Sequence, residues 1–181
     1  MALNDHSSQS SQREKVLEHL FVGELLRCLW KRGLRDVEVL RSEVDRGGYD
    51  IVVECGGILR HIQLKASYAG AKTRDVKVNT NLALKPSGCV IWMNFDPDTL
   101  ELGPFLWFGA APGTPLPALG ERVARHTKGD RTGFKSARAG LRMVAQRKFR
   151  RLESIDEVAA ALFSPLQKGS PEIRQMAPSS D

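Results

Sequence analysis

The sequence has few of the residues that build disulfide frameworks or zinc sites. It holds three cysteines, Cys28, Cys55 and Cys89, which lie far apart, and no CxxC pair. Its four histidines form no ligand spacing. We therefore expect no zinc site and no disulfide framework, and thiols of this kind fit a reducing cytoplasm.

Long apolar runs are also missing. No stretch approaches the roughly 20 apolar residues that a membrane-spanning helix needs, and residues 1–15, MALNDHSSQSSQREK, hold no apolar segment long enough for a signal peptide. We expect a cytoplasmic protein that does not bind membranes. The motifs GxxxxGK[ST], GxGxxG, HExxH and GxSxG are absent as well, so nothing supports a nucleotide hydrolase, a dinucleotide enzyme, a zincin or an α/β-hydrolase.

Positive charge is what the sequence has in excess. The net charge is +6 and the pI is about 9.5, so a polyanion is a plausible partner. Residues 122–151 concentrate this charge, with eleven Lys or Arg and one acid, Asp130. Such a segment suits the phosphate backbone of a nucleic acid, without sequence preference. A solvated basic surface is the alternative. The residues predicted to contact the nucleic acid are Lys128, Arg131, Lys135 and Arg138.

Length and local patterns indicate one domain, residues 13–164, between polar tails at 1–12 and 165–181 that we expect to be disordered. Residues 67–80 are predicted to be mobile, and Ser154 with Glu157 forms a capping box. The predicted helices are 13–32, which Gly33 ends, and 155–163. The predicted strands are 36–40, the two halves of a hairpin around Gly56-Gly57, 89–96 and 102–110.

The hairpin YDIVVECGGILRHIQLKAS carries polar residues inside apolar strands. If Gly56-Gly57 is a two-residue turn, the register places Asp50 opposite Gln63. Side chains alternate along a strand, so Gln63 and Lys65 share a face. The three polar groups are therefore predicted to meet at the open end of the hairpin. The alternative is an ordinary solvated face of an antiparallel hairpin.

Glu24 is a second polar residue in an apolar setting. At about 100° per residue, Leu17, Leu20, Phe21 and Cys28 fall on one side of the first helix, with Glu24 among them and Glu14 and Glu18 nearer the edge. A buried acid is costly unless it is paired, hydrogen-bonded or bound to a metal. An ion pair with an arginine at the edge of the core is the alternative.

Three segments, GELLRCLWKRG, GGYD and IQLK, together resemble the PD-(D/E)xK nuclease superfamily. The likeness is closest to its QxK variants, such as Mrr-type restriction endonucleases, with Holliday-junction resolvases further off, and it covers about residues 13–96. The family order is a helix Glu, a strand Asp and a [E/D/Q]-x-Lys on the next strand. Two positions depart from it: Tyr49 replaces the proline before the Asp, and the neutral Gln63 replaces the second acid.

The resemblance implies an α/β fold with a restriction-endonuclease-like central mixed β-sheet flanked by helices. It implies a Mg²⁺- or Mn²⁺-dependent nuclease that hydrolyses DNA phosphodiester bonds, with double-stranded or branched DNA as substrate and a homodimer left open. Lys65 would orient the attacking water and stabilise developing charge. The alternatives are an inactive nuclease fold that binds nucleic acid or a partner protein, and a structural accessory protein. The implied catalytic residues are Glu24, Asp50, Gln63 and Lys65, and the implied metal ligands are Glu24, Asp50, Gln63 and the backbone carbonyl of Leu64.

Overall fold

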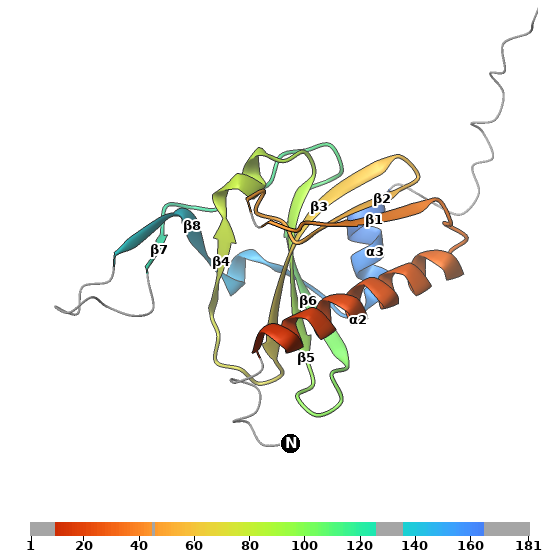
Figure 1. Ribbon diagram of the computed structural model, residues 1–181, viewed down its shortest axis with the longest axis horizontal. Coiled ribbons are helices and arrows are strands. Elements are labelled where there is room, and N and C mark those ends of the chain that lie inside the picture. The colour runs from red at the N-terminus through yellow and green to blue at the C-terminus, as the bar shows by residue number, and fades with distance from the viewer. Residues whose placement is uncertain (1–9, 45, 126–135, 165–181) are drawn as a thin grey trace, which may run out of the picture.

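A computed structural model describes residues 10–44, 46–125 and 136–164 (Figure 1). Two α-helices, two 3₁₀ turns and nine strands make up this part of the chain. In chain order they are α2 (Ser10–Lys31), β1 (Val37–Arg41), β2 (Ile51–Cys55), β3 (Ile58–Tyr68), β4 (Asp75–Asn79), η1 (Thr80–Leu84), β5 (Gly88–Phe95), β6 (Leu102–Gly109), β7 (Val123–Arg125), β8 (Ala137–Ala145), η2 (Gln146–Lys148), β9 (Arg150–Leu152) and α3 (Ile155–Phe163).

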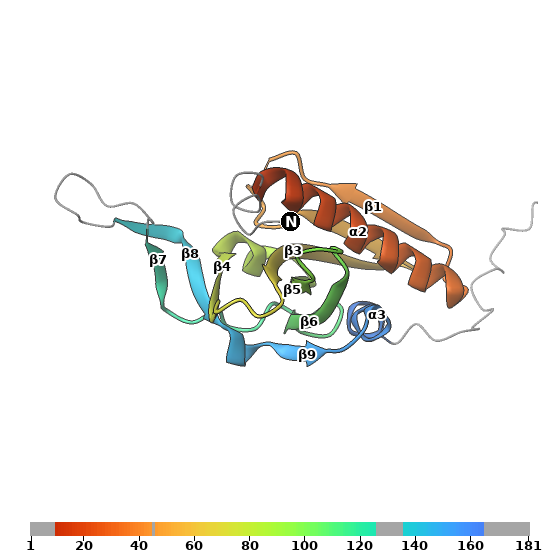
Figure 2. The ribbon, with the colours of Figure 1, turned by 90° about the horizontal axis from the view of Figure 1, so that it is seen from below.

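A six-stranded sheet of order β1-β2-β3-β5-β6-β9 forms the centre of the molecule. Strands β3 and β5 run parallel, and the other neighbouring pairs run antiparallel. Both helices pack on one face of this sheet in a shared apolar core. The other face is covered by a three-stranded sheet of order β4-β8-β7 and by the loop after β6 (Figure 2). The predicted central mixed sheet with flanking helices is confirmed, with both helices on the same side.

The β2–β3 hairpin has the predicted register. Gly56 and Gly57 have φ angles of 53° and 77°, as a type I′ turn requires at both central positions. Ile51 pairs with Ile62 and Cys55 with Ile58, so Asp50 lies beside Gln63 at the open end of the hairpin.

The helix boundaries follow local capping chemistry. Gly33, with φ of 80°, ends α2 as predicted, but the helix begins at Ser10, so residues 10–12 are helical and not part of a tail. The Ser154 hydroxyl accepts from the N–H of Glu157 at 3.3 Å. The Glu157 carboxylate in turn accepts from the N–H of Glu153 at 3.1 Å. The predicted last helix and its capping residue are confirmed.

The prediction that residues 67–80 are mobile is wrong at both ends of that segment, since residues 67–68 belong to β3 and Thr80 to η1. Residues 75–79 form β4, which pairs with β8. Its alternating Val76 and Val78 are buried in the second core, together with Trp92. Local composition hid this strand because its partner, β8, lies more than 50 residues later in the chain.

Within the described residues, no helix is long and apolar enough to cross a bilayer.

Candidate active site

Asp50 lies where one edge of β3 loses its strand partner. The β2–β3 ladder ends at Ile51 and Ile62, while β3 continues to Tyr68 along β5. The N–H of Leu64 donates to the Asp50 carboxylate at 2.6 Å. Because the N–H and C=O of one strand residue point to the same edge, the Leu64 carbonyl opens toward Asp50 as well.

A cavity of about 520 Å³ lies beside Asp50, between the sheet and the first turns of α2. Asp50, Leu64 and Lys65 line it from the sheet, and Glu14 and Glu18 line it from the helix. The remaining lining residues are Ser11, Arg13, Lys15, Ala66 and Met93. Two elements therefore bring Asp50, Lys65, Glu14 and Glu18 to the wall of one hollow.

Glu18 is the buried acid of this cavity, with 7% of its surface exposed. One oxygen accepts from the Lys15 ammonium at 3.0 Å. The other lies 3.2 Å from Nε of Arg41, with which it forms an ion pair, and it is buried without a hydrogen-bond partner. Arg41 also contacts Nε2 of His19 at 2.9 Å. Glu18 is thus a carboxylate with unused acceptor capacity, held between cations.

Glu24 does not join Asp50. It lines a separate depression on the outer side of α2, with Val16, Leu20 and Gly23. It lies six residues from Glu18, which is about 9 Å along the axis and about 120° around it. Partial burial raises the pKa of the Glu24 carboxyl, which the Arg27 guanidinium partly offsets. The predicted grouping of Glu24 with the hairpin residues is therefore corrected: the structure places Glu18 and Glu14 there.

Gln63 is buried, with 3% of its surface exposed, and does not line the cavity. Its side-chain oxygen accepts from the N–H of Asn79 at 3.3 Å. Gly48 packs directly against the same segment. A Cβ at this position would lie 2.9 Å from the Asn79 side chain and from the Leu82 nitrogen, so the absence of a side chain allows the close approach. In this arrangement Gln63 fixes the junction of β4 and η1 to the central sheet.

The donor set of the cavity suits a hard cation. Asp50 and Glu18 offer carboxylates, and Leu64 offers a carbonyl. Mg²⁺ is usually held by one or two carboxylates with several waters, and it takes oxygen ligands. Among the residues that the structure describes, no three His, Cys, Asp or Glu side chains come together as a complete metal site. Oε1 of Glu18 is ion-paired with Arg41 but accepts no hydrogen bond, so this carboxylate keeps an acceptor position for a cation.

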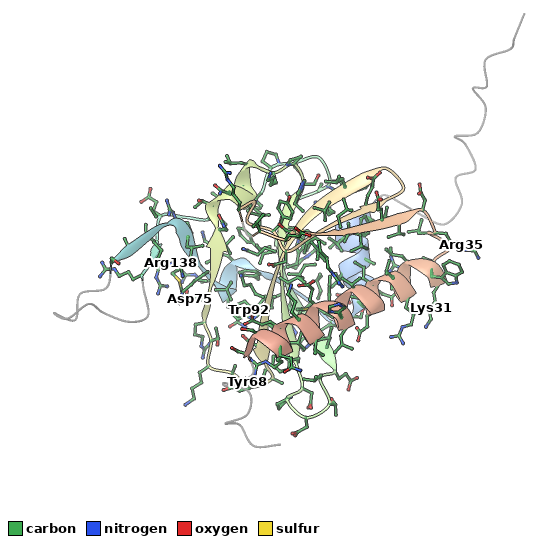
Figure 3. The ribbon with its side chains drawn as sticks, in the orientation of Figure 1. Lys31, Arg35, Tyr68, Asp75, Trp92 and Arg138 are labelled. Carbon is green, nitrogen blue, oxygen red and sulfur yellow. The ribbon has the colours of Figure 1, made fainter. Side chains whose placement is uncertain are left out.

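The predicted nucleic-acid segment is described only in part. Lys128, Arg131 and Lys135 lie outside the described residues. Arg138 is exposed on β8, in the β7–β8 arm that projects from the body (Figures 1 and 3). Arg125 is exposed on the paired strand, opposite Ala137. The alternative, a solvated basic surface, remains compatible with this exposure.

Comparison with known proteins gives weak structural likenesses. No protein-family model matches the sequence, and no curated protein matches it. The Holliday junction resolvase Hjc of Archaeoglobus fulgidus is 16% identical, with 78% of this chain and 98% of that chain covered and a TM-score of 0.37. A bacterial homing endonuclease is 23% identical, with 61% and 77% covered and a TM-score of 0.25. Both TM-scores lie below 0.5, so neither likeness indicates a function, which has to follow from the residues of this chain.

Proposed function

We propose that the protein is a metal-dependent nuclease that hydrolyses DNA phosphodiester bonds, with Mg²⁺ or Mn²⁺ as cofactor. The observation that carries the proposal is the cavity shared by Asp50, Lys65 and the buried Glu18. Asp50 and Glu18 supply carboxylate oxygens and Lys65 supplies a cation, and the cavity lies at the open edge of the sheet. Phosphoryl transfer needs acidic metal ligands, a cation and access for the phosphate. The basic β7–β8 arm supports DNA, double-stranded or branched, as the substrate.

Each residue of the proposed site has a distinct task. Asp50, fixed by the Leu64 N–H, and Glu18 would hold the cation through oxygen atoms, and the Leu64 carbonyl would assist. A bound cation would supply an activated water and neutralise charge at the phosphate. Lys65 would orient the attacking water and stabilise charge on the phosphoryl oxygens. Gln63 would act indirectly, by keeping β4 and η1 in place beside the cavity.

Lys65→Ala tests this site. We expect the variant to lose cleavage by at least about 100-fold while it keeps the fold and most DNA affinity, because it removes support for the transition state alone. The measurement compares wild type and variant, purified side by side, on supercoiled, linear, branched and single-stranded DNA with Mg²⁺, Mn²⁺ and EDTA. Equal nicking by both proteins would mark a contaminant and contradict the proposal.

Glu18→Gln and Glu24→Gln form a matched pair on one helix. Both remove one negative charge and keep the side-chain shape. If Glu18 serves the cavity, Glu18→Gln lowers the cleavage rate and weakens Mn²⁺ binding, followed by paramagnetic relaxation of water protons, far more than Glu24→Gln does. The reverse ranking would return the catalytic role to Glu24 and would require α2 to rotate on DNA binding.

A catalytically inactive DNA-binding protein is the second candidate. Two observations favour it: the Gln63 oxygen is already used by Asn79, and the described residues hold no group of three acidic, histidine or cysteine ligands. DNA binding by wild type with no cleavage of any substrate by any variant would support this candidate.

A further inference from the structure

A second cavity, of about 850 Å³, lies at the β6–β9 edge of the central sheet. It is larger than the cavity beside Asp50 and shares no lining residue with it. Its walls come from β6, the loop after β6, β9 and α3, which lie together on one side of the molecule (Figure 2). Concave sites of this size with mostly apolar walls are typical of small-ligand sites. The apolar lining of this β9 cavity is formed by Trp107, Phe108, Pro112, Pro117 and Leu152.

The charged residues of the β9 cavity are mostly cations. Lys148, Arg150 and Arg151 line it, and Glu157 is the single acid among its lining residues. The Glu157 carboxylate already accepts from the N–H of Glu153 at 3.1 Å, and Glu153 forms an ion pair with Arg151 at 2.6 Å. The Lys148 ammonium contacts two backbone carbonyls, at 3.4 and 3.5 Å. Among the described residues, none forms a hydrogen bond or an ion pair with the Arg150 side chain, so Arg150 is available to an anion.

A buried cation lies behind the wall of this cavity. Arg60 is fully buried and donates to the carbonyls of Ala110 and Ala161, both of which line the cavity. Carbonyl dipoles offset its charge only in part, and no carboxylate of the described residues forms an ion pair with it. Fully buried arginines are rare without a partner of opposite charge. Arg60 also neutralises the negative end of α3, which would otherwise repel an anion from the cavity.

Trp107 adjoins both arginines on the face of the sheet that carries the helices. The Arg60 guanidinium carbon lies 5.5 Å from the centroid of the Trp107 ring. Arg150 is directly opposite Trp107 on β9, and directly opposite residues have their side chains on the same face of a sheet. A flat apolar side chain is therefore combined with a buried cation and an unpaired one.

We propose that the β9 cavity binds a small organic anion, a molecule with a phosphate or carboxylate group on an apolar body. Arg150 and Lys148 bind the anionic group through charge-assisted hydrogen bonds, and the apolar body packs against Trp107, Pro112 and Pro117. The charge of Arg60 adds to the attraction, because charges interact more strongly in the low dielectric of the protein interior than in water. A DNA strand suits the cavity less well, since the lining is mostly apolar. This inference does not rest on the proposed nuclease activity.

Isothermal titration calorimetry of the full chain with 1-naphthyl phosphate and 1-naphthoate tests the proposal. Both compounds carry an anionic group on an apolar body, and they differ in the anionic group. We expect at least one of them to bind with a dissociation constant below about 1 mM, and the tighter one identifies the preferred group. Inorganic phosphate and 1-naphthol each supply one half of the ligand, so each should bind at least about tenfold more weakly.

The double variants K148Q/R150Q and R125Q/R147Q form a matched pair. Each removes two exposed positive charges, but only the first alters residues of the β9 cavity. K148Q/R150Q should weaken binding of the tighter naphthyl compound at least about tenfold, because it removes charge-assisted hydrogen bonds, and R125Q/R147Q should leave binding unchanged. Ala160→Gln keeps the charge but takes up space at the α3 wall, so it should weaken binding as well.

Circular dichroism checks that each variant is folded. The proposal is overturned if neither naphthyl compound binds to the wild-type protein. Equal weakening by the two double variants overturns it as well, because it would mark a general attraction of anions to a basic protein. A loss of DNA affinity in K148Q/R150Q, with no binding of either compound to wild type, would make the cavity part of a DNA-binding surface instead.

Discussion

Single residues show how burial sets chemical reactivity in this protein. Complete burial raises the pKa of the Cys89 thiol to about 12, and Arg60 nearby lowers it only in part. Burial also raises the pKa values of Cys28 and Cys55. Because the thiolate is the reactive form, we expect none of the three cysteines to react with a disulfide reagent such as DTNB in the native state. All three should react once denaturant unfolds the protein, and a thiol that titrates rapidly before unfolding would contradict the packing described for that cysteine.

The sequence locates the strand residues of the candidate site better than the helix residue. The register of Asp50, Gln63 and Lys65 follows from the turn at Gly56-Gly57, which is local. The helix acid depends on which side of α2 faces the sheet. Leu20 suggests an apolar side that includes Glu24, but Leu20 is exposed and Glu18 is buried. A helical wheel with apolar residues on two sides cannot distinguish the face that meets the sheet from a face that meets another partner.

At the scale of elements, Arg60 fixes α3 to the central sheet. Its fully buried guanidinium donates to the carbonyls of Leu162 at 2.6 Å and Ala161 at 3.0 Å, at the C-terminal end of the helix, and to Ala110 at 3.0 Å. A cation is favourable at a helix C-terminus because of the helix dipole. Burial lowers the pKa of Arg60, so the carbonyls compensate a cation that has lost its water.

Arg60→Leu should therefore destabilise the protein through α3. Leaving buried carbonyls unsatisfied costs about 1–3 kcal/mol for each group, so we expect the free energy of unfolding to fall by at least about 2 kcal/mol. For a chain of this size the melting temperature would fall by roughly 4–8 °C. Calorimetry measures the loss, and hydrogen exchange should show it first in α3. Arg151→Leu, at an exposed position on β9, is the control that should change little.

Elements defined by local signals are predicted well, and those defined by distant contacts are not. The capping box at Ser154 and the glycine after α2 act within a few residues, so both helices are visible in the sequence. Strand β4 exists because β8 pairs with it. In the sequence, Arg60 cannot be distinguished from an ordinary polar strand residue. Its three acceptors are supplied by segments about 50 to 100 residues later.

At the scale of the whole molecule, positive side chains lie at both ends of the long axis. Arg138 lies at the β7–β8 arm, while Lys31 and Arg35 lie at the opposite end (Figure 3). If the arm binds DNA, neutralising Lys128, Arg131, Lys135 and Arg138 together should weaken binding to all sequences alike. The slope of log affinity against log salt should fall by up to about 4, roughly one for each lost phosphate contact.

The double variant K31Q/R35Q is the control for this measurement. It removes positive charge far from the arm, so it lowers the net charge without changing the expected contacts. Fluorescence anisotropy of labelled duplexes across a salt series separates the two effects. An arm variant with the same salt slope as wild type would show that the arm is only a solvated surface.

The connection between the parallel strands β3 and β5 has a consequence for the order of assembly during synthesis. That connection is β4 and η1, and β4 is secured by β8, which begins at Ala137. At translation rates of roughly 5–20 residues per second, the link between the two central strands has to wait several seconds for its partner to be made. The ribosome-bound chain therefore carries an incompletely covered central sheet until β8 emerges. During this interval the sheet exposes the largest apolar surface to which a chaperone could bind.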